Sequence, residues 1–374
     1  MRPTRLPSRS PGSSEGPRSS ADRVSIRPNP PERSLTELSR QGLRDLLLSW
    51  GEPRYRADQL YRWLFQRGVR DVEQMTDLSK SLRRHLRENE YTIGRVTLEK
   101  VRESIDGTRK LQFRLADGAA IESVLIPMPG GLFTQCLSSQ VGCAMDCQFC
   151  YTGTLGLSRH LTSGEMIDQV VRAADGLPPG SRIDHIVYMG MGEPLHNFDA
   201  VVASLGVICD PDGCGYSHKR VTISTSGLVP QIDKLGRVAP VNLAISLNAS
   251  NDEVRNQIMP VNKRWNIDAL IEAVRRYPLP PRRKLTFEYV LLGGVNDTDD
   301  DARRLVKLLV GLPARINIIP WNPFEGTRFL RPADERVRSF QRILLDRGLT
   351  ATVRVTKGLD IDAACGQLGE RPSA

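Results

Sequence analysis

The amino-acid sequence predicts an α/β protein built around a partial (βα)6 barrel, with a small N-terminal helical module and a short β-meander in front of it. Strand and helix patterns alternate from about residue 134 to residue 356. Parallel strands joined by helices need both faces of their sheet covered, and a closed or half-closed barrel provides this. The chain has 374 residues, 40% of them hydrophobic, which is enough to bury a sizeable core.

The predicted barrel strands are short runs rich in branched apolar residues. They are Ile183–Met189, Arg220–Ser224, Val241–Leu247, Leu285–Leu291, Ile316–Ile319 and Thr350–Val355. Amphipathic helical patterns separate them, at Phe198–Cys209, Ile267–Arg276, Asp299–Leu309 and Glu335–Arg347. Before the first strand, Thr162 and Glu165 have the spacing of a helix capping box. Catalytic groups of such a barrel belong at the carboxyl ends of its strands.

Two modules are predicted before the barrel, a helical one at residues 34–91 and a β-meander at residues 92–133. The helical module has three amphipathic helices, and the last carries Arg83, Arg84 and Arg87 on its outer side. This basic face is either ordinary solvated surface or a footprint for an RNA backbone. The meander has strands joined by Asp-Gly turns, and its last strand holds Glu122, whose ordinary role would be that of a solvent-facing strand residue.

Composition limits the protein's partners and location. The net charge of +9 favours a polyanionic partner. Residues 1–33 are rich in Pro, Ser and Arg, which predicts a disordered basic tail, and residues 357–374 form a C-terminal segment with one cysteine. No apolar run approaches the ~18 residues of a membrane span. Three of the seven cysteines lie together at residues 143–150, and thiols that bind a metal need a reducing compartment. We therefore expect a cytoplasmic protein without a membrane partner.

A loop with three closely spaced cysteines is the strongest functional signal. Cys143, Cys147 and Cys150 follow the pattern C-x-x-x-C-x-x-C, and thiolates are the soft ligands of iron–sulfur clusters and zinc. Three cysteines on a four-iron cluster leave one iron free to chelate S-adenosylmethionine (SAM), and this spacing resembles the radical-SAM superfamily. The alternative is a zinc knuckle with a fourth ligand from elsewhere, but no second knuckle follows in the sequence.

Small polar residues follow several predicted barrel strands. They occur in Gly190-Met-Gly-Glu-Pro194, Ser224-Thr-Ser-Gly227, Ser246-Leu-Asn248 and Ile319-Pro-Trp-Asn-Pro323. Glycines allow a ligand to approach the backbone, and the Glu193 carboxylate can pair with an ammonium group. Each of these residues could instead only cap the helix that follows.

Taken together, these motifs resemble the RlmN/Cfr-type radical-SAM RNA adenosine methyltransferases. The resemblance runs from about Leu38 to Gln367. Its segments are Cys136–Cys143, the cysteine loop, Gly190–Pro194, Val221–Gly227 and Asp360–Leu368. The last segment, Asp-Ile-Asp-Ala-Ala-Cys-Gly-Gln-Leu, is the most specific. Asn248 stands where many relatives have His, and Tyr151 where a small residue is usual.

The resemblance implies two SAM molecules per turnover. The first methylates Cys365, giving S-methylcysteine. The second binds a [4Fe-4S] cluster held by Cys143, Cys147 and Cys150 and yields a radical that removes a hydrogen from that methyl group. The resulting methylene adds to adenine, Cys136 releases the product by forming a disulfide with Cys365, and Glu122 accepts the ring proton. The implied SAM-binding residues are Gly192, Glu193, Ser224, Ser246, Leu247, Asn248 and Asn322.

The substrate implied by the resemblance is ribosomal RNA. RlmN-type enzymes methylate C2 of one adenosine in the peptidyl-transferase centre of 23S rRNA and, in some cases, the adenosine next to the anticodon in tRNA. Cfr-type enzymes methylate C8 of the same rRNA adenosine, and this alternative stays open here. A different class of function would be a non-catalytic RNA-binding protein with a structural metal, which would not need both Cys136 and Cys365. The further expectations are an electron donor such as flavodoxin or ferredoxin and a monomeric state.

Overall fold

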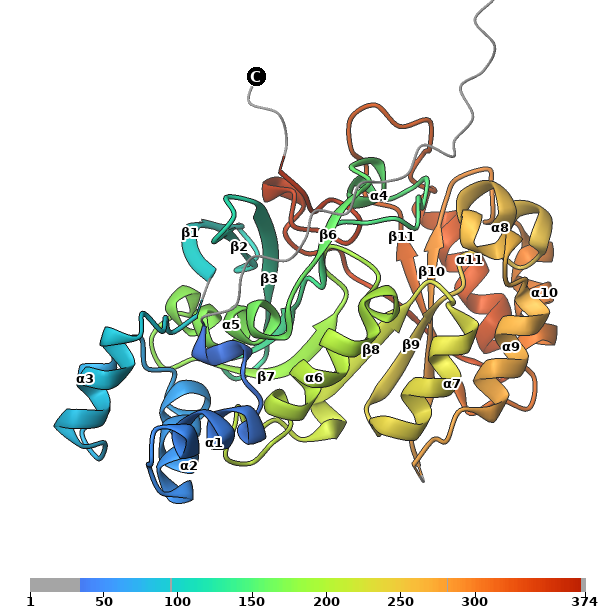
Figure 1. Cartoon of the computed structure of the whole chain (residues 1–374). Coiled ribbons are helices and arrows are strands. Elements are labelled where there is room, and N and C mark those ends of the chain that lie inside the picture. The colour runs from blue at the N-terminus through green and yellow to red at the C-terminus, as the bar shows by residue number, and fades with distance from the viewer. Residues whose placement is uncertain (1–33, 95, 281, 371–374) are drawn as a thin grey trace, which may run out of the picture.

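One sheet of ten strands organises the computed structural model, which describes residues 34–370 apart from positions 95 and 281 (Figure 1). Its order is β1-β2-β3-β4-β7-β8-β9-β10-β11-β12. The strands are β1 (Val96–Glu103), β2 (Arg109–Leu115), β3 (Ala120–Met128), β4 (Leu132–Cys136), β7 (Arg182–Tyr188), β8 (Val221–Thr225), β9 (Asn242–Ser246), β10 (Leu285–Leu291), β11 (Ala314–Pro320) and β12 (Thr350–Val353). A separate pair joins β5 (Gln140–Gly142) to β6 (Leu157–His160). The basic tail predicted at residues 1–33 lies outside the described residues.

Strand β4 joins the meander to the barrel. It pairs antiparallel with β3, where Cys136 faces Val124, and parallel with β7, where Cys136 faces Val187. From β4 to β12 all neighbouring strands are parallel. The sequence patterns predicted every parallel strand except β4, because its five residues are few and include the polar Thr134 and Gln135. The predicted α/β barrel is confirmed, and the meander continues its sheet.

The helices follow the predicted strand–helix alternation. Those of the barrel region are α4 (Tyr151–Thr154), α5 (Ser163–Ala173), α6 (Phe198–Ile208), α7 (Val229–Val238), α8 (Asp252–Ile258), α9 (Ile267–Arg276), α10 (Asp299–Leu309) and α11 (Asp334–Leu345). The capping box of Thr162 and Glu165 at the start of α5 is confirmed. Helices α7 and α8 were not predicted; α8 is short and polar, and α7 begins beside a proline. Within the described residues no helix combines the length and apolarity needed to cross a membrane.

The N-terminal module packs on the side of the barrel (Figure 1). It contains α1 (Arg40–Ser49), α2 (Arg54–Tyr61) and α3 (Lys80–Glu88). Its helices bury one apolar face, which includes Leu43, Leu60 and Leu82. Polar contacts fix its position: Arg40 pairs with Asp212 at 2.8 Å, and the Glu37 carboxylate accepts from the backbone N–H of Gly164 at 3.1 Å. The module is therefore held against α5 and the loop after α6.

The C-terminal segment, residues 357–370, lies between the meander and the cysteine loop. On the meander side, Ser104 Oγ donates to Asp360 at 2.5 Å, and the N–H of Gly358 donates to Asp106 at 2.8 Å. On the other side, the N–H of Tyr151 donates to the Gly366 carbonyl at 2.7 Å, and Thr152 Oγ1 donates to the Leu368 carbonyl at 2.6 Å. The segment is anchored before and after Cys365.

Candidate active site

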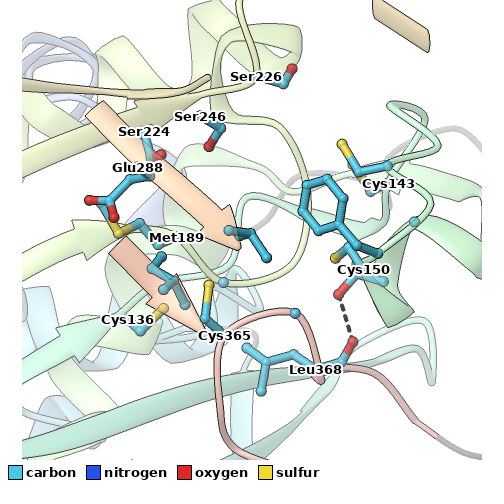
Figure 2. A pocket seen from close by; sticks show the side chains of 18 of the residues that line it. Cys136, Cys143, Cys150, Met189, Ser224, Ser226, Ser246, Glu288, Cys365 and Leu368 are labelled. Atoms are coloured by element: carbon cyan, nitrogen blue, oxygen red, sulfur yellow. Dashed lines mark hydrogen bonds between the residues drawn. The ribbon is translucent and has the colours of Figure 1, made fainter. Parts of the chain in front are cut away.

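A single pocket at the carboxyl ends of the barrel strands collects most of the predicted site residues (Figure 2). Its walls come from β3, β4, β7, β8, β9, β10 and β11, from the cysteine loop and from the C-terminal segment. The predicted residues among its lining are Cys136, Cys143, Cys147, Cys150, Gly192, Glu193, Ser224, Ser246, Asn248, Asn322 and Cys365. The fold thus brings these residues together from distant parts of the chain.

The cysteine loop is fixed by hydrogen bonds from and to its backbone. The N–H of Cys143 donates to the Gly156 carbonyl at 2.8 Å, and the N–H of Gln148 donates to the Ile258 carbonyl, at the end of α8, at 3.0 Å. Phe149 is buried, and its carbonyl accepts from Trp321 Nε1 at 3.0 Å. The loop therefore presents its three thiols to the pocket from a backbone that the barrel holds in place.

Burial raises the pKa of all three thiols of this loop. Burial raises the pKa of Cys143 to about 12. Burial, and then the negative charge of Cys150 and Cys143, raises the pKa of Cys147 well above its usual value. A bound cationic centre takes thiols as thiolates and removes this repulsion. Within the described chain, no three His, Cys, Asp or Glu side chains are grouped so that they could hold a single metal ion. The three thiols of the loop instead line one pocket. Three thiols on one loop suit a cluster that binds each through a different iron.

Glu193 is held rigidly at the pocket wall. Its buried carboxylate accepts from the backbone N–H of Ser226 at 2.7 Å and of Leu195 at 3.1 Å. Its own N–H donates to Gln140 Oε1 at 2.8 Å, and Gly192 beside it has a φ of +98°. A side chain at Gly192 would approach Gln140 Cβ to 2.5 Å, so only glycine fits there. Burial raises the pKa of Glu193.

The residues at the ends of β8 and β9 differ in whether their side chains face the pocket or the core. Ser224 and Ser246 line the pocket, as predicted (Figure 2). Asn248 also lines it, but its Oδ1 accepts from the N–H of Val290 at 2.8 Å and its carbonyl accepts from Asn296 Nδ2 at 2.7 Å. Leu247 is fully buried and lies outside the lining; its N–H donates to the Glu288 carbonyl, and its carbonyl accepts from Arg255. The Leu247 side chain therefore packs in the core.

Cys136 and Cys365 lie far apart in the sequence but line the same pocket (Figure 2). Cys136 ends β4 and is buried, whereas Cys365 is exposed in the pocket, and Asn322 Nδ2 holds its carbonyl at 3.0 Å. Burial, and then the charge of Cys365, raises the pKa of Cys136 to about 12. Both are free thiols here, so the disulfide implied by the family resemblance is not formed in this state.

The Glu122 side chain does not face solvent, although a solvent-facing position is the ordinary one for a glutamate on a strand. It is buried on β3, but it is absent from the pocket lining. Its carboxylate pairs with Lys110 at 3.0 Å and accepts from the N–H of Gly369 at 2.9 Å. The C-terminal segment therefore covers the carboxylate that the resemblance assigns as proton acceptor.

Two charged pocket residues were missed from the sequence. Glu288 on β10 is buried and accepts from Asn317 Nδ2 at 3.0 Å through Oε1, while Oε2 has no hydrogen-bond partner among the described residues (Figure 2). Arg354, just after β12, lines the same pocket. A glutamate inside the predicted strand Leu285–Leu291, which is mostly apolar, was a usable signal, because a charge in a buried strand needs a partner or a function. Arg354 carried no such signal.

Comparisons with known proteins agree on one family. Residues 33–91 match the family model of the ribosomal RNA large subunit methyltransferase N-terminal domain, and residues 137–308 match that of the radical SAM superfamily. A dual-specificity RNA methyltransferase RlmN of Syntrophotalea carbinolica is 51% identical over 335 residues, 89% of either chain. The protein of the same name from Geobacter sulfurreducens is 50% identical over 90% of either chain. A crystal structure of a radical SAM methyltransferase from Sphaerobacter thermophilus matches with a TM-score of 0.85 at 44% identity, covering 90% of this chain and 99% of that one.

Proposed function

Because this chain belongs to the RlmN family of dual-specificity radical-SAM RNA methyltransferases, we propose that its pocket methylates C2 of an adenosine in 23S rRNA through Cys365. The adenosine next to the anticodon in tRNA is its second proposed substrate. The observation that carries this proposal is the single pocket that contains Cys136, Cys365 and all three cysteines of the loop. The enzyme uses SAM and a [4Fe-4S] cluster, as its family does.

Neither alternative function is favoured. The relatives described above carry the RlmN name, which speaks against C8 methylation of the Cfr type. A non-catalytic RNA-binding protein with a structural metal would leave the joint presence of Cys136 and Cys365 in one pocket without a purpose. C2 methylation accounts for both thiols.

The cysteine loop and the strand ends are proposed to hold the cluster and SAM. Cys143, Cys147 and Cys150 would ligate three irons, and the cluster, when reduced, supplies the radical chemistry by cleaving SAM. Glu193 retains lone pairs beyond those used by Ser226 and Leu195, so it can still accept from the SAM ammonium. Ser224 and Ser246 offer hydroxyls at the same rim, and Asn322 positions Cys365. Gly192 and Asn248 would contact SAM through their backbone atoms, whereas Leu247 would contribute only by packing in the core behind the site.

Cys365 and Cys136 are proposed to act in sequence. The Cys365 sulfur accepts a methyl group from the first SAM. A hydrogen atom of that methyl group would pass to the radical derived from the second SAM, and the remaining methylene radical would add to adenine C2. Glu122 takes the C2 proton. One electron would pass from the adduct back to the cluster. The Cys136 thiolate then attacks the Cys365 sulfur, so that a sulfur–sulfur bond forms as the carbon–sulfur bond to the product breaks, and the released carbon takes a proton to complete the methyl group. The exposed Cys365 and the buried Cys136 suit these roles, because only the first must meet the RNA.

The remaining expectations stay proposals. Residues 34–91 would contact the RNA backbone, residues 92–133 would form the meander, residues 134–356 the barrel, and residues 357–374 the segment that presents Cys365. Flavodoxin or ferredoxin would supply electrons, and the enzyme would act as a monomer. A cytoplasmic location follows from the reducing conditions that the thiols need and from an RNA substrate.

Mass spectrometry of nucleosides tests the proposed function. Ribosomal RNA and tRNA from a host strain lacking its own C2 methyltransferase would be digested with and without this chain restored. We expect 2-methyladenosine to return with the chain and to stay absent with its Cys365→Ala variant. Appearance of 8-methyladenosine would mean Cfr-type chemistry, and no methyladenosine of either kind would refute the proposal.

A further inference from the structure

Lys110 and Glu122 form a buried ion pair beneath the C-terminal segment. Lys110 Nζ lies 3.0 Å from Glu122 Oε1, and both side chains are only 7% exposed. Gln112 is the direct partner of Glu122 across the β2–β3 pairing, so the lysine reaches the carboxylate diagonally from the neighbouring position. Glu122 shares a face of β3 with Val124 and Ile126, which line the pocket. The pair therefore sits at the edge of the pocket.

The same pair also holds the segment that carries Cys365. Lys110 Nζ donates to the Asp362 carbonyl at 3.3 Å, and Glu122 Oε2 accepts from the N–H of Gly369 at 2.9 Å. These contacts lie on either side of Cys365 in the sequence. One ammonium and one carboxylate thus connect β2, β3 and both flanks of the methyl-accepting cysteine.

Stability alone is a weak reason for such a pair. Removing two charges from water costs about as much as their attraction returns, so apolar residues of similar volume would hold a sheet as well. Each Glu122 oxygen already accepts from a donor, one from Lys110 and one from the segment. Each oxygen keeps a further lone pair, but Glu122 is buried under the backbone at Gly369, so a substrate can reach the carboxylate only where that cover withdraws. Gly369 belongs to the C-terminal segment, which lies outside the sheet, whereas Lys110 lies on strand β2.

We propose that Lys110 is a positioning residue, which fixes the orientation of the Glu122 carboxylate and ties it to the segment that presents Cys365. This inference rests on the proposed role of Glu122 as proton acceptor. With the segment docked, Cys365 faces the pocket and Glu122 is covered. As the residues around Gly369 withdraw, Glu122 becomes open to adenine while Lys110 still holds it. Once Glu122 has taken the ring proton it is neutral and a weaker acceptor for the N–H of Gly369, so the segment stays withdrawn while product is released.

Separate assays of Cys365 methylation and RNA methylation test the role of Lys110. In Lys110→Met we expect S-methylation of Cys365, measured by peptide mass spectrometry, to stay within about 3-fold of wild type, because Asn322 and Thr152 still anchor the segment at Cys365 and Leu368. Methylation of RNA should fall by at least about 10-fold, with a protein–RNA adduct visible on denaturing gels. Lys110→Arg should restore most of the activity, because it keeps the charge. Lys100→Met is the matched control, since Lys100 is an exposed lysine of the adjacent strand β1.

A double-mutant cycle decides whether Lys110 acts through Glu122. If it does, Lys110→Met adds little loss in a Glu122→Gln background. Additive losses, an equal fall in both methylation steps, or wild-type activity of Lys110→Met would each overturn the inference. Failure of the assumed role of Glu122 looks different, because Glu122→Gln would then methylate RNA at the wild-type rate. If Lys110→Met unfolds at a lower temperature than Lys100→Met, Lys110→Gln repeats the test with a neutral side chain that still donates hydrogen bonds.

Discussion

The pocket contains two groups of cysteines that the chain assembles in different ways. Cys143, Cys147 and Cys150 lie on one loop, where short-range hydrogen bonds fix them. Cys136 and Cys365 come from the end of β4 and from the C-terminal segment, and only the fold brings them together. The first group can be recognised from spacing, whereas the second depends on sheet order and on the anchors of the segment. The proposed cluster ligands and the proposed reaction pair therefore place different demands on the sequence.

Removing a loop cysteine is expected to have the largest effect, because the loop has no spare ligand. In Cys147→Ala, two thiolates remain for a centre that needs three, so SAM cleavage and RNA methylation should fall below detection. Iron and sulfide analysis of anaerobically purified protein measures the cluster directly. Cys209→Ala is the matched control, since Cys209 lies outside the pocket lining. Full iron and sulfide content in Cys147→Ala would refute the assignment of this loop.

Removing Cys136 should stop the reaction at a later stage. Cys136→Ala keeps the loop, so it should still methylate Cys365 and attack RNA, but it has no thiol to release the product. We expect a covalent protein–RNA adduct and at most one turnover, a loss of more than ~100-fold in product per enzyme over a long incubation. Cys365→Ala should form no adduct. Multiple turnovers by Cys136→Ala would contradict the proposed roles.

The same contrast explains what could be predicted from sequence. Helices α9 and α10 and strand β10 have the predicted bounds, because their apolar periodicity and caps are local features. Gly192, Glu193 and Ser224 could be placed at the pocket from the sequence because they lie at or just after the ends of recognisable strands. The burial of Glu122, its pairing with Lys110 and its cover by Gly369 were not foreseeable, since they join β2, β3 and a distant segment. Strand β4 was missed for the same reason, because its neighbours on either side define it better than its residues do.

The protonation of Cys136 offers a smaller test of the second group. Its pKa, raised by burial from 9.0 to about 12, keeps the thiol protonated through neutral pH. The thiolate fraction at pH 9 should be about 500-fold below that of an ordinary thiol, so alkylation should keep rising up to pH ~10.5 where a normal thiol levels off. Alkylation of the same residue in urea-unfolded protein is the control. A plateau near pH 9 in the folded protein would contradict the raised pKa.

The sign of the matching stability effect follows from proton binding. Between pH 9 and about 12 the folded chain keeps the Cys136 proton and the unfolded chain loses it. The free energy of unfolding contributed by this group is thus complete below pH 9 and is lost as the pH rises toward 12. Cys136→Ala should lessen the alkaline decline in stability.

The smallest expected effect concerns the N-terminal module, whose basic face was predicted to touch RNA. Arg83 and Arg87 share the carboxylate of Glu73 at 2.9 and 3.0 Å, whereas Arg84 is exposed and makes no hydrogen bond or ion pair with the described residues. If the face binds phosphates, Arg84→Ala should weaken RNA binding by about 3- to 10-fold at low salt and lower the slope of log affinity against log salt by about 0.9, because one phosphate contact is lost. Arg83→Ala should matter less, because Glu73 already neutralises that charge. Arg338→Ala, at an exposed position on α11, is the control. If Arg84→Ala and Arg338→Ala give the same salt slope, this face is only solvated surface, and the RNA backbone must be bound elsewhere on the chain.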